Sequence, residues 1–310
     1  MIVKVKNLVK RYKELIALDH FNMEVEEGEI LGLLGPNGCG KTTAINSILS
    51  LLNFDKGEIE VFGKKMTPNS YDIKRKIGVV PQEVSVFENL TVKENIDYFC
   101  GLYVDDKNLR KQYVEEAIDF VDLNNYIKFY PKKLSGGLKR RLNIACGIAH
   151  KPKLIFLDEP TVAVDAQSRN FILNGIKKLN KEGSTIIYTT HYLEEAEMIC
   201  SRIIIMDKGK DLVSGTTEEL KAMITTSEKI VAEFLNIQDE TIEKMKSIPH
   251  VIDIEKDGKD CIIKFENGTN NLTNLLEFIK ENNLAYTKLH SQLPTLNDVF
   301  LELTGKGLRD

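Results

Sequence analysis

Residues 35–43 read GPNGCGKTT, and their glycines, lysine and hydroxyls have the spacing of a loop that binds phosphate. A strand-like apolar run precedes them at 30–34, and a helix-like segment follows at 44–52. Glycines let backbone amides point at an anion, and the N-terminus of the following helix adds a partial positive charge. The segment therefore predicts a site for a nucleoside triphosphate. Its residues are Gly35, Pro36, Asn37, Gly38, Cys39, Gly40, Lys41, Thr42 and Thr43.

Three side chains of this loop have specific chemistry. Lys41 can place its charge against the β- and γ-phosphates, and the Thr42 hydroxyl can bind the Mg²⁺ that accompanies ATP. Cys39 lies beside a helix N-terminus and two residues from Lys41, an environment that favours the thiolate. Alkylation of Cys39 is therefore expected to inactivate the protein. A glycine-rich turn with a surface lysine, the alternative interpretation, does not account for the coincidence of strand, loop and helix.

Two carboxylates follow the apolar run LIFL at 154–157. Asp158 and Glu159 then lie at the carboxyl end of an expected central strand, the edge at which open α/β sheets bind ligands. Asp158 can hold Mg²⁺ through water, and Glu159 can polarise the water that attacks the γ-phosphate. Taken alone, the pattern equally describes a strand that meets a solvated turn. The phosphate loop upstream favours the catalytic interpretation.

Three further segments offer polar groups to a phosphate. Gln82 follows the expected strand 77–80 and is a candidate ligand of Mg²⁺ or water. His191 follows the expected strand 185–190, and its imidazole can bond a γ-phosphate oxygen. Ser135, Gly136 and Gly137 open a helix that is either ordinarily capped or an anion site. Each residue also has an ordinary structural interpretation when it is considered alone.

Composition limits the classes of function. The chain has 310 residues, 42% of them hydrophobic, so we expect two domains with sizeable cores. A net charge of −4 argues against a nucleic-acid-binding surface. Five cysteines without a Cys-x-x-Cys pair are typical of a reducing cytoplasm. No signal sequence or apolar run of about 20 residues is present, so we expect any membrane role to require a partner.

The order of strands and helices predicts two domains. Over 1–225, short apolar strands alternate with helices, which indicates an α/β fold with a mostly parallel sheet, and a helical subdomain is expected at about 85–150. Its helices are expected at 92–103, 109–121 and 137–149. After the Thr-Thr-Ser of 225–227 the order changes to βαββαβ, which predicts a small ferredoxin-like α+β domain over 226–310. A last helix is expected to begin at Thr295 and to end before Gly305.

These motifs, in this order, resemble the ATP-binding cassette (ABC) ATPases of transporters over residues 1 to about 220. The matching features are Tyr12, the phosphate loop 35–43, Gln82, LSGG at 134–137, the strand and carboxylates at 154–159, and His191. The resemblance implies ATP and Mg²⁺ as ligands and two cassettes that face each other head to tail, so that the LSGG residues serve the partner's nucleotide. It also implies that Tyr12 stacks on adenine, that Gln82 links the γ-phosphate to a transmembrane permease, and that Asp165 belongs to the loop that joins the two sites.

The sequence departs from this family at two places. Leu138 stands where the signature usually has glutamine, and Ala163-Val164 occupy the loop after the carboxylates. These differences bear on hydrolysis rate and coupling rather than on phosphate contacts, because Leu138 follows the amides that would bind.

The C-terminal PTLNDVFLELTG resembles the ending of bacterial ATPases that export antibiotics or peptides. We therefore expect the ATP-hydrolysing subunit of a bacterial exporter, held at the cytoplasmic face of the membrane by a separate permease. A soluble ABC ATPase acting on nucleic acid or the ribosome is the alternative, but the single cassette, the absence of a coiled-coil insertion and the lack of basic excess argue against it. A P-loop kinase would not explain LSGG or His191. The cargo and the identity of the second cassette, the same chain or another, are left open.

Overall fold

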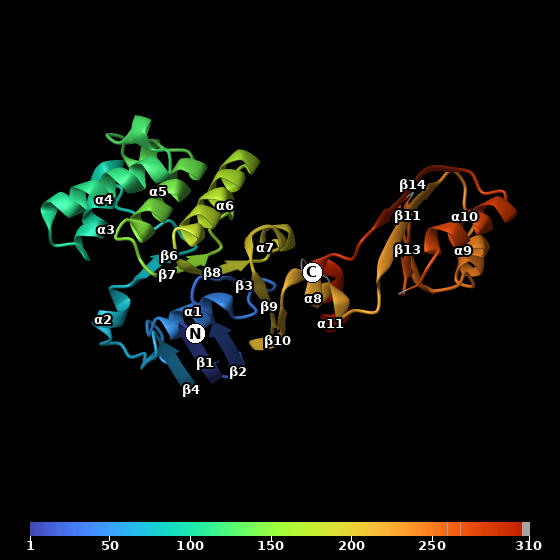
Figure 1. Cartoon of the computed structure of the whole chain (residues 1–310), viewed down its shortest axis with the longest axis horizontal. Helices are drawn as coiled ribbons and strands as arrows, with labels where there is room; N and C mark the ends of the chain where they lie inside the picture. Colours follow the sequence, from blue (N-terminus) through green and yellow to red (C-terminus); the bar gives the residue numbers. More distant parts are fainter. Residues whose placement is uncertain (259, 267, 306–310) are drawn as a thin grey trace. The chain divides into compact units, whose positions relative to one another are not determined.

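A computed structural model describes residues 1–258, 260–266 and 268–305. It divides the chain into two compact units, Met1–Gly215 and the residues from Thr216 onward, and each is described here by itself (Figure 1). No helix among the described residues is long and apolar enough to cross a membrane.

A six-stranded, mostly parallel sheet forms the centre of the first unit, with strand order β10-β9-β3-β8-β7-β6. Its strands are β3 (Ile30–Leu34), β6 (Ile77–Val80), β7 (Leu154–Asp158), β8 (Thr185–Thr190), β9 (Arg202–Asp207) and β10 (Lys210–Gly215). Every residue of β3, β7 and β8 is buried, as expected for strands covered on both faces. Because these three strands are parallel, their carboxyl ends lie along the same edge of the sheet.

A second, antiparallel sheet has the order β2-β1-β4-β5. Its strands are β1 (Val3–Tyr12), β2 (Leu15–Val25), β4 (Lys56–Val61) and β5 (Lys64–Lys65). The sequence predicted only 3–5 and 21–25 of this sheet. The β1–β2 pairing changes register between Val5 and Leu8 and again near Lys10, so the alternation that reveals a strand is interrupted.

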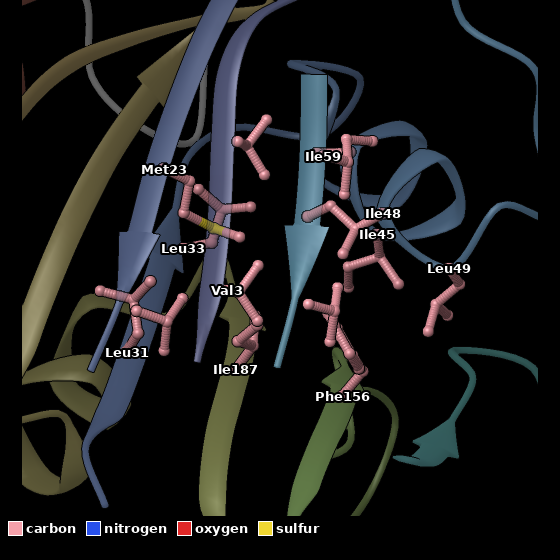
Figure 2. Close-up of a cluster of buried hydrophobic side chains, with 14 of the residues drawn as sticks. Val3, Met23, Leu31, Leu33, Ile45, Ile48, Leu49, Ile59, Phe156 and Ile187 are labelled. Atoms are coloured by element: carbon pink, nitrogen blue, oxygen red, sulfur yellow. The ribbon is translucent and has the colours of Figure 1, made fainter. Parts of the chain in front are cut away.

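One hydrophobic core joins the two sheets to the helix that follows the phosphate loop, α1 (Lys41–Ile48). Figure 2 shows side chains of β1, β2 and β4 facing those of β3, β7 and β8, with α1 at the side. The labelled members are Val3, Met23, Leu31, Leu33, Ile45, Ile48, Leu49, Ile59, Phe156 and Ile187. Burial of each large aliphatic side chain contributes about 1.5–3 kcal/mol, so this core fixes the strand and helix on either side of the loop.

Helices α3 (Val92–Gly101), α4 (Lys107–Phe120) and α5 (Gly136–Ile148) form the helical subdomain, which confirms the three expected helices to within two residues at each end. Thr91 and Glu94 cap α3 reciprocally, because Thr91 N–H donates to Glu94 at 2.7 Å and Glu94 N–H to Thr91 Oγ1 at 3.3 Å. Apolar residues of these helices pack with β7 and with α6 (Ala166–Lys181). The remaining helices of the unit are α2 (Tyr71–Lys74) and α7 (Leu193–Ile199), with short 3-10 turns at Asn124–Tyr126 and Pro131–Lys133.

The second unit contains the expected βαββαβ order. Its elements are β11 (Glu228–Phe234), α9 (Asp239–Met245), β12 (Val251–Asp257), β13 (Asp260–Phe265), α10 (Asn271–Glu281) and β14 (Tyr286–Gln292). The antiparallel order β12-β13-β11-β14 is that of a ferredoxin-like sheet. The last helix, α11 (Leu296–Thr304), begins after Thr295 and ends at Gly305, which has the left-handed φ of 70° expected of a C-terminal glycine.

The unit begins earlier than the expected domain boundary after residue 225. Helix α8 (Thr217–Ala222) packs with α11, and both the Thr225 amide and its hydroxyl donate to Glu302 at 3.0 Å. These contacts assign 216–225 to the second unit. The expected second domain extends to residue 310, of which 306–310 lie outside the described residues.

Candidate active site

The phosphate loop connects the buried strand β3 to α1. Gly40 has a φ of 113°, and a Cβ at this position would lie 2.6 Å from the Ala17 carbonyl oxygen, so a side chain is excluded on both counts. The Lys41 side chain is buried, and its Nζ donates to the carbonyl oxygens of Gly35 at 2.8 Å and Pro36 at 3.1 Å. The lysine cation is therefore held inside the loop rather than in solvent.

A cavity of about 470 Å³ lies over this loop. It brings together the predicted residues Tyr12, Asn37, Gly38, Gly40, Lys41, Thr42, Thr43, Gln82 and Glu159. Leu15, Ile16, Ala17, Lys208 and Gly209 also line it and were not predicted. The first three belong to the irregular hairpin that the sequence did not reveal, and the last two to the turn between β9 and β10.

The aromatic residue at the rim of this cavity is Tyr12, whose side chain is 45% exposed. Lys10 Nζ lies 4.9 Å from the centroid of the Tyr12 ring, so one face of the ring is approached by a cation. A base stacked on Tyr12, as the resemblance implies, would have to use the ring face that Lys10 does not approach.

Asp158 is the last residue of β7, and its carboxylate contacts the phosphate loop through Thr42. Its Oδ2 accepts a hydrogen bond from Thr42 Oγ1 at 2.8 Å, and its Oδ1 accepts one from Thr189 Oγ1 at 2.6 Å. A hydroxyl and a carboxylate next to a phosphate site are the oxygen ligands that Mg²⁺ prefers. No group of three or more His, Cys, Asp and Glu that could hold a metal occurs among the described residues. The Thr42 hydroxyl and the Asp158 carboxylate are donors of the kind that fits Mg²⁺.

Glu159 is the point at which the predicted catalytic residues meet. Its Oε1 lies 3.2 Å from Lys41 Nζ, its Oε2 lies 3.2 Å from His191 Nδ1, and Oε2 accepts a hydrogen bond from Gln82 Nε2 at 3.3 Å. Its backbone has a φ of 46°, in the left-handed region that non-glycine residues adopt rarely. The Glu159 amide donates to Thr189 Oγ1 at 3.0 Å, so Thr189 of β8 contacts the Asp158 carboxylate and the Glu159 backbone.

Helix α5 holds the segment that carries Gln82 through two of its side chains. Arg140 is buried, and its Nη1 donates to the carbonyl oxygens of Gln82 at 2.6 Å and Pro81 at 3.3 Å. Burial lowers the pKa of the Arg140 guanidinium. Asn143 donates to Pro81 at 3.2 Å and accepts from the Ser85 amide at 3.0 Å. Sequence reasoning missed both residues, and the only available signal was a charged residue on the expected buried face of α5.

Ser135, Gly136 and Gly137, all within the described residues, do not line the cavity over the chain's own phosphate loop. Ser135 caps α5 and accepts from the Leu138 amide at 3.3 Å. A Cβ on Gly137 would lie 2.3 Å from Ser168 Oγ, so this glycine permits close packing of α5 on α6. Asp165 caps α6, and hydrogen bonds from the Ser168 amide and hydroxyl hold the pKa of its carboxyl below the usual value.

The environment of Cys39 differs from the expected one. The side chain is only 4% exposed, and a Cβ on Gly35 would lie 2.6 Å from its sulfur, so the thiol is packed against the loop's own backbone. Burial raises the pKa of the Cys39 thiol above its usual value, although Lys41 opposes the shift. The prediction of a thiolate at this position is therefore wrong, because desolvation outweighs the nearby positive charge.

The fold and site define a P-loop ATPase of the cassette type, with a helical subdomain inserted before β7. A family model described as ABC transporter matches residues 18–162, and one described as the C-terminal domain of DrrA1-3-like ATP-binding proteins matches 215–304. The chain is 35% identical over 311 residues to the linearmycin resistance ATP-binding protein LnrL of Bacillus subtilis, with all of both chains covered. The chain belongs to the ABC transporter family and is a nucleotide-binding, ATP-hydrolysing subunit.

Other relatives are similar over nearly the whole chain. The daunorubicin resistance ATP-binding protein DrrA2 of Streptomyces coeruleorubidus is 32% identical over 98% of this chain and 95% of its own. The Nod factor export ATP-binding protein I of Sinorhizobium fredii is 31% identical over 99% of this chain and 87% of its own. The expected family, fold class and ATPase activity are thus confirmed.

The cassette is also similar to solved structures. The ATP-binding cassette MJ0796, a dimer in a post-hydrolysis state bound to ADP and Pi, is 29% identical with a TM-score of 0.64 and covers 69% of this chain and 98% of its own. A second dimeric MJ0796 structure matches to the same extent. Nucleotide binding and dimeric assembly are therefore established features of cassettes similar to this one.

Proposed function

We propose that this chain hydrolyses Mg-ATP as one of two facing cassettes and thereby drives export of an antibiotic or similar compound through a separate permease. The observation that carries the catalytic part is the convergence of Lys41, Gln82 and His191 on the Glu159 carboxylate, next to the phosphate loop. The observation that supports export is the full-length similarity to resistance and export proteins.

Binding of the triphosphate is assigned to the loop. Its amides and the N-terminus of α1 would contact the phosphate oxygens, and Lys41 would supply the cationic contact to the β- and γ-phosphates. Thr42 and Asp158, whose side-chain oxygens are 2.8 Å apart, are the residues that would hold Mg²⁺, with Gln82 as a further candidate. When bound, Mg²⁺ would neutralise negative charge on the phosphate oxygens.

Glu159 is proposed as the base that orients and deprotonates the attacking water. The contact with Lys41 places the carboxylate beside the group that binds the γ-phosphate, where such a water would lie. His191, 3.2 Å from the same carboxylate, can then hydrogen-bond a γ-phosphate oxygen. Gln82 donates to the proposed base through Nε2. A change in nucleotide at the site can therefore move Gln82 and the segment that follows it.

A second cassette is proposed because Ser135 and the glycines after it lie outside the chain's own cavity. Their capped helix N-terminus is suited to a phosphate, which a facing cassette would present. The dimeric structures of MJ0796 support this assembly.

An exposed apolar surface near Gln82 is the proposed docking site for the permease, which would hold the subunit at the cytoplasmic face of the membrane. Four of its residues are between 37% and 56% exposed, namely Val84, Phe87, Tyr98 and Leu102. The Phe87 and Tyr98 ring centroids are 4.9 Å apart. Apolar groups of this size on a surface mark interaction sites. Its closeness in sequence to Gln82 would let the permease sense the nucleotide.

The test is reconstitution with the permease. The tagged subunit is purified from membranes, the co-purifying membrane protein is identified, and the pair is placed in inside-out vesicles with candidate antibiotics and ATP. We expect ATP-dependent accumulation of one compound class, which Phe87→Ser weakens by impairing assembly. Co-purification with ribosomes or nucleic acid instead of a membrane protein would favour the alternative function.

A further inference from the structure

A buried glutamate outside the cavity accepts hydrogen bonds from three hydroxyls. Glu195 of α7 is 3% exposed, and its Oε2 accepts from Tyr188 at 2.6 Å, Thr161 at 2.8 Å and Thr190 at 3.1 Å. All three donors are at most 1% exposed. Burial and the neighbouring Glu195 carboxylate raise the pKa of the Tyr188 hydroxyl, which therefore remains a donor.

Two of these donors lie within two residues of a proposed catalytic group. Thr161 is two residues after Glu159, in a turn closed by the hydrogen bond from the Val162 amide to the Glu159 carbonyl at 3.3 Å. Thr190 directly precedes His191, and its hydroxyl also accepts from the Tyr192 amide at 2.9 Å. One carboxylate oxygen thus accepts hydrogen bonds from side chains close in sequence to both proposed catalytic residues.

A third set of contacts leads from Glu195 to His191 through Arg169 and Tyr192. Arg169 of α6 places Nε 3.4 Å from Glu195 Oε1, and its guanidinium lies 4.9 Å from the Tyr192 ring centroid. The Tyr192 ring centroid is in turn 4.2 Å from that of His191. Among the described residues, neither Arg169 Nε nor Glu195 Oε1 has a hydrogen-bond partner, so their attraction is ionic only.

We propose that Glu195 is a positioning residue for ATP hydrolysis, which holds Thr161 and Thr190 and through them aims Glu159 and His191 at the γ-phosphate. The inference rests on the proposed roles of these two residues. A buried carboxylate is a poor device for stability, because well-packed apolar residues often replace buried charges without loss. Glu159 has a left-handed backbone, and the hydrogen bond from Thr161 to Glu195 fixes the chain two residues after it.

Glu195→Gln tests the proposal in the full-length subunit. The amide keeps the size of the side chain and one acceptor oxygen but loses the charge, so Thr161 and Thr190 are held less firmly. We expect kcat to fall between about 10- and 100-fold, the range typical of a small misplacement of catalytic groups, while KM and the affinity for a fluorescent ATP analogue change less than about twofold. Glu194→Gln, the same change at an exposed neighbour on α7, should behave as wild type in all three measurements.

Three hydroxyl deletions keep the test decisive if Glu195→Gln does not fold. Thr161→Val and Thr190→Val remove donors that lie within two residues of Glu159 and His191, at nearly constant shape. Tyr188→Phe removes the donor that lies farther back along β8, three residues before His191. We expect both valine variants to lower kcat more than Tyr188→Phe does at comparable Tm. Wild-type kcat in Glu195→Gln, or kcat losses that simply follow Tm across the hydroxyl variants, would overturn the proposal. Wild-type kcat in Glu159→Gln would refute Glu159 as the proposed base, whereas wild-type kcat in Glu195→Gln alone would refute only the positioning role of Glu195.

Discussion

At the scale of single residues, the site is a set of charges kept close together and away from water. Lys41 and Glu159 are 4% and 7% exposed in their side chains and lie 3.2 Å apart, and each charge depends on the other for its compensation. Truncating either side chain to alanine would leave the other charge buried and unpaired, so a loss of activity could not be separated from a loss of stability. Isosteric substitutions are therefore the informative ones.

We predict that Glu159→Gln reduces ATP turnover by about 10²–10⁴-fold, because an amide cannot accept the proton of the attacking water. ATP binding should persist, since Lys41 keeps its hydrogen bonds to the Gly35 and Pro36 carbonyls. Phosphate release and nucleotide binding are measured on the same samples, with exposed Glu182→Gln of the first unit as a matched control. A variant that hydrolyses at the wild-type rate removes Glu159 from the role of base.

The raised pKa of Cys39 leads to a second prediction. Because the thiol's pKa lies above that of a free cysteine, its thiolate fraction at pH 7 is smaller than usual and grows only as the pH rises past the ordinary thiol range. Alkylation of Cys39 should therefore be slow at pH 7 and accelerate in alkaline buffer. Mass spectrometry of the Cys39 peptide over a pH series measures this, with Cys39→Ser showing any effect of other thiols. Rapid labelling at pH 7 that Mg-ATP prevents would contradict the buried thiol.

At the scale of elements, the sequence predicted the parts whose pattern is local. β3 is an apolar run that leads into the phosphate loop, β7 is an apolar run that ends in Asp158, and β8 has an apolar centre between threonines. The glycine spacing of the phosphate loop is unambiguous. Contacts between distant segments were not predictable. The bonds from Thr189 to Asp158 and from Arg140 to Gln82 span 31 and 58 residues, and they depend on strand order and helix packing. Most of the β1–β2 hairpin was not predicted, because its register shifts interrupt the two-residue alternation of a strand.

The N-terminus of α5 is the element that tests the facing assembly. We predict that Ser135→Arg blocks hydrolysis without preventing nucleotide binding to its own loop, because Ser135 does not line that cavity. Mixing it with Lys41→Met, which keeps the length of the buried side chain, should restore partial ATPase activity, since one site of the mixed dimer carries both lesions and the other carries neither. Differently tagged chains are co-purified and assayed, and Ser135→Ala controls for loss of the helix cap, worth about 1 kcal/mol. Confirmed mixed dimers without activity would argue for sites completed within one chain.

At the scale of the whole molecule, the chain consists of two units with separate cores. The nucleotide-contacting residues proposed above all lie before residue 216. The apolar core of the second unit includes buried residues of β11, β13, α9 and α10, such as Ile230, Met245, Ile263 and Leu275. The match of a distinct C-terminal family model to 215–304 supports the same division. We therefore infer that the first unit can bind nucleotide without the second.

We predict that a chain ending at Gly215 folds and binds ATP with near wild-type affinity, whereas one ending at Ile224 aggregates more. The longer chain retains α8, whose Leu220 is fully buried in the intact protein and loses its partner helix α11 on truncation. An exposed apolar helix face promotes association. Size-exclusion chromatography with light scattering and titration with a fluorescent ATP analogue compare the two chains, with the full-length protein as reference. Loss of folding in the chain ending at Gly215 would show that the cassette depends on the second unit, and better behaviour of the longer chain would move the boundary back toward residue 225.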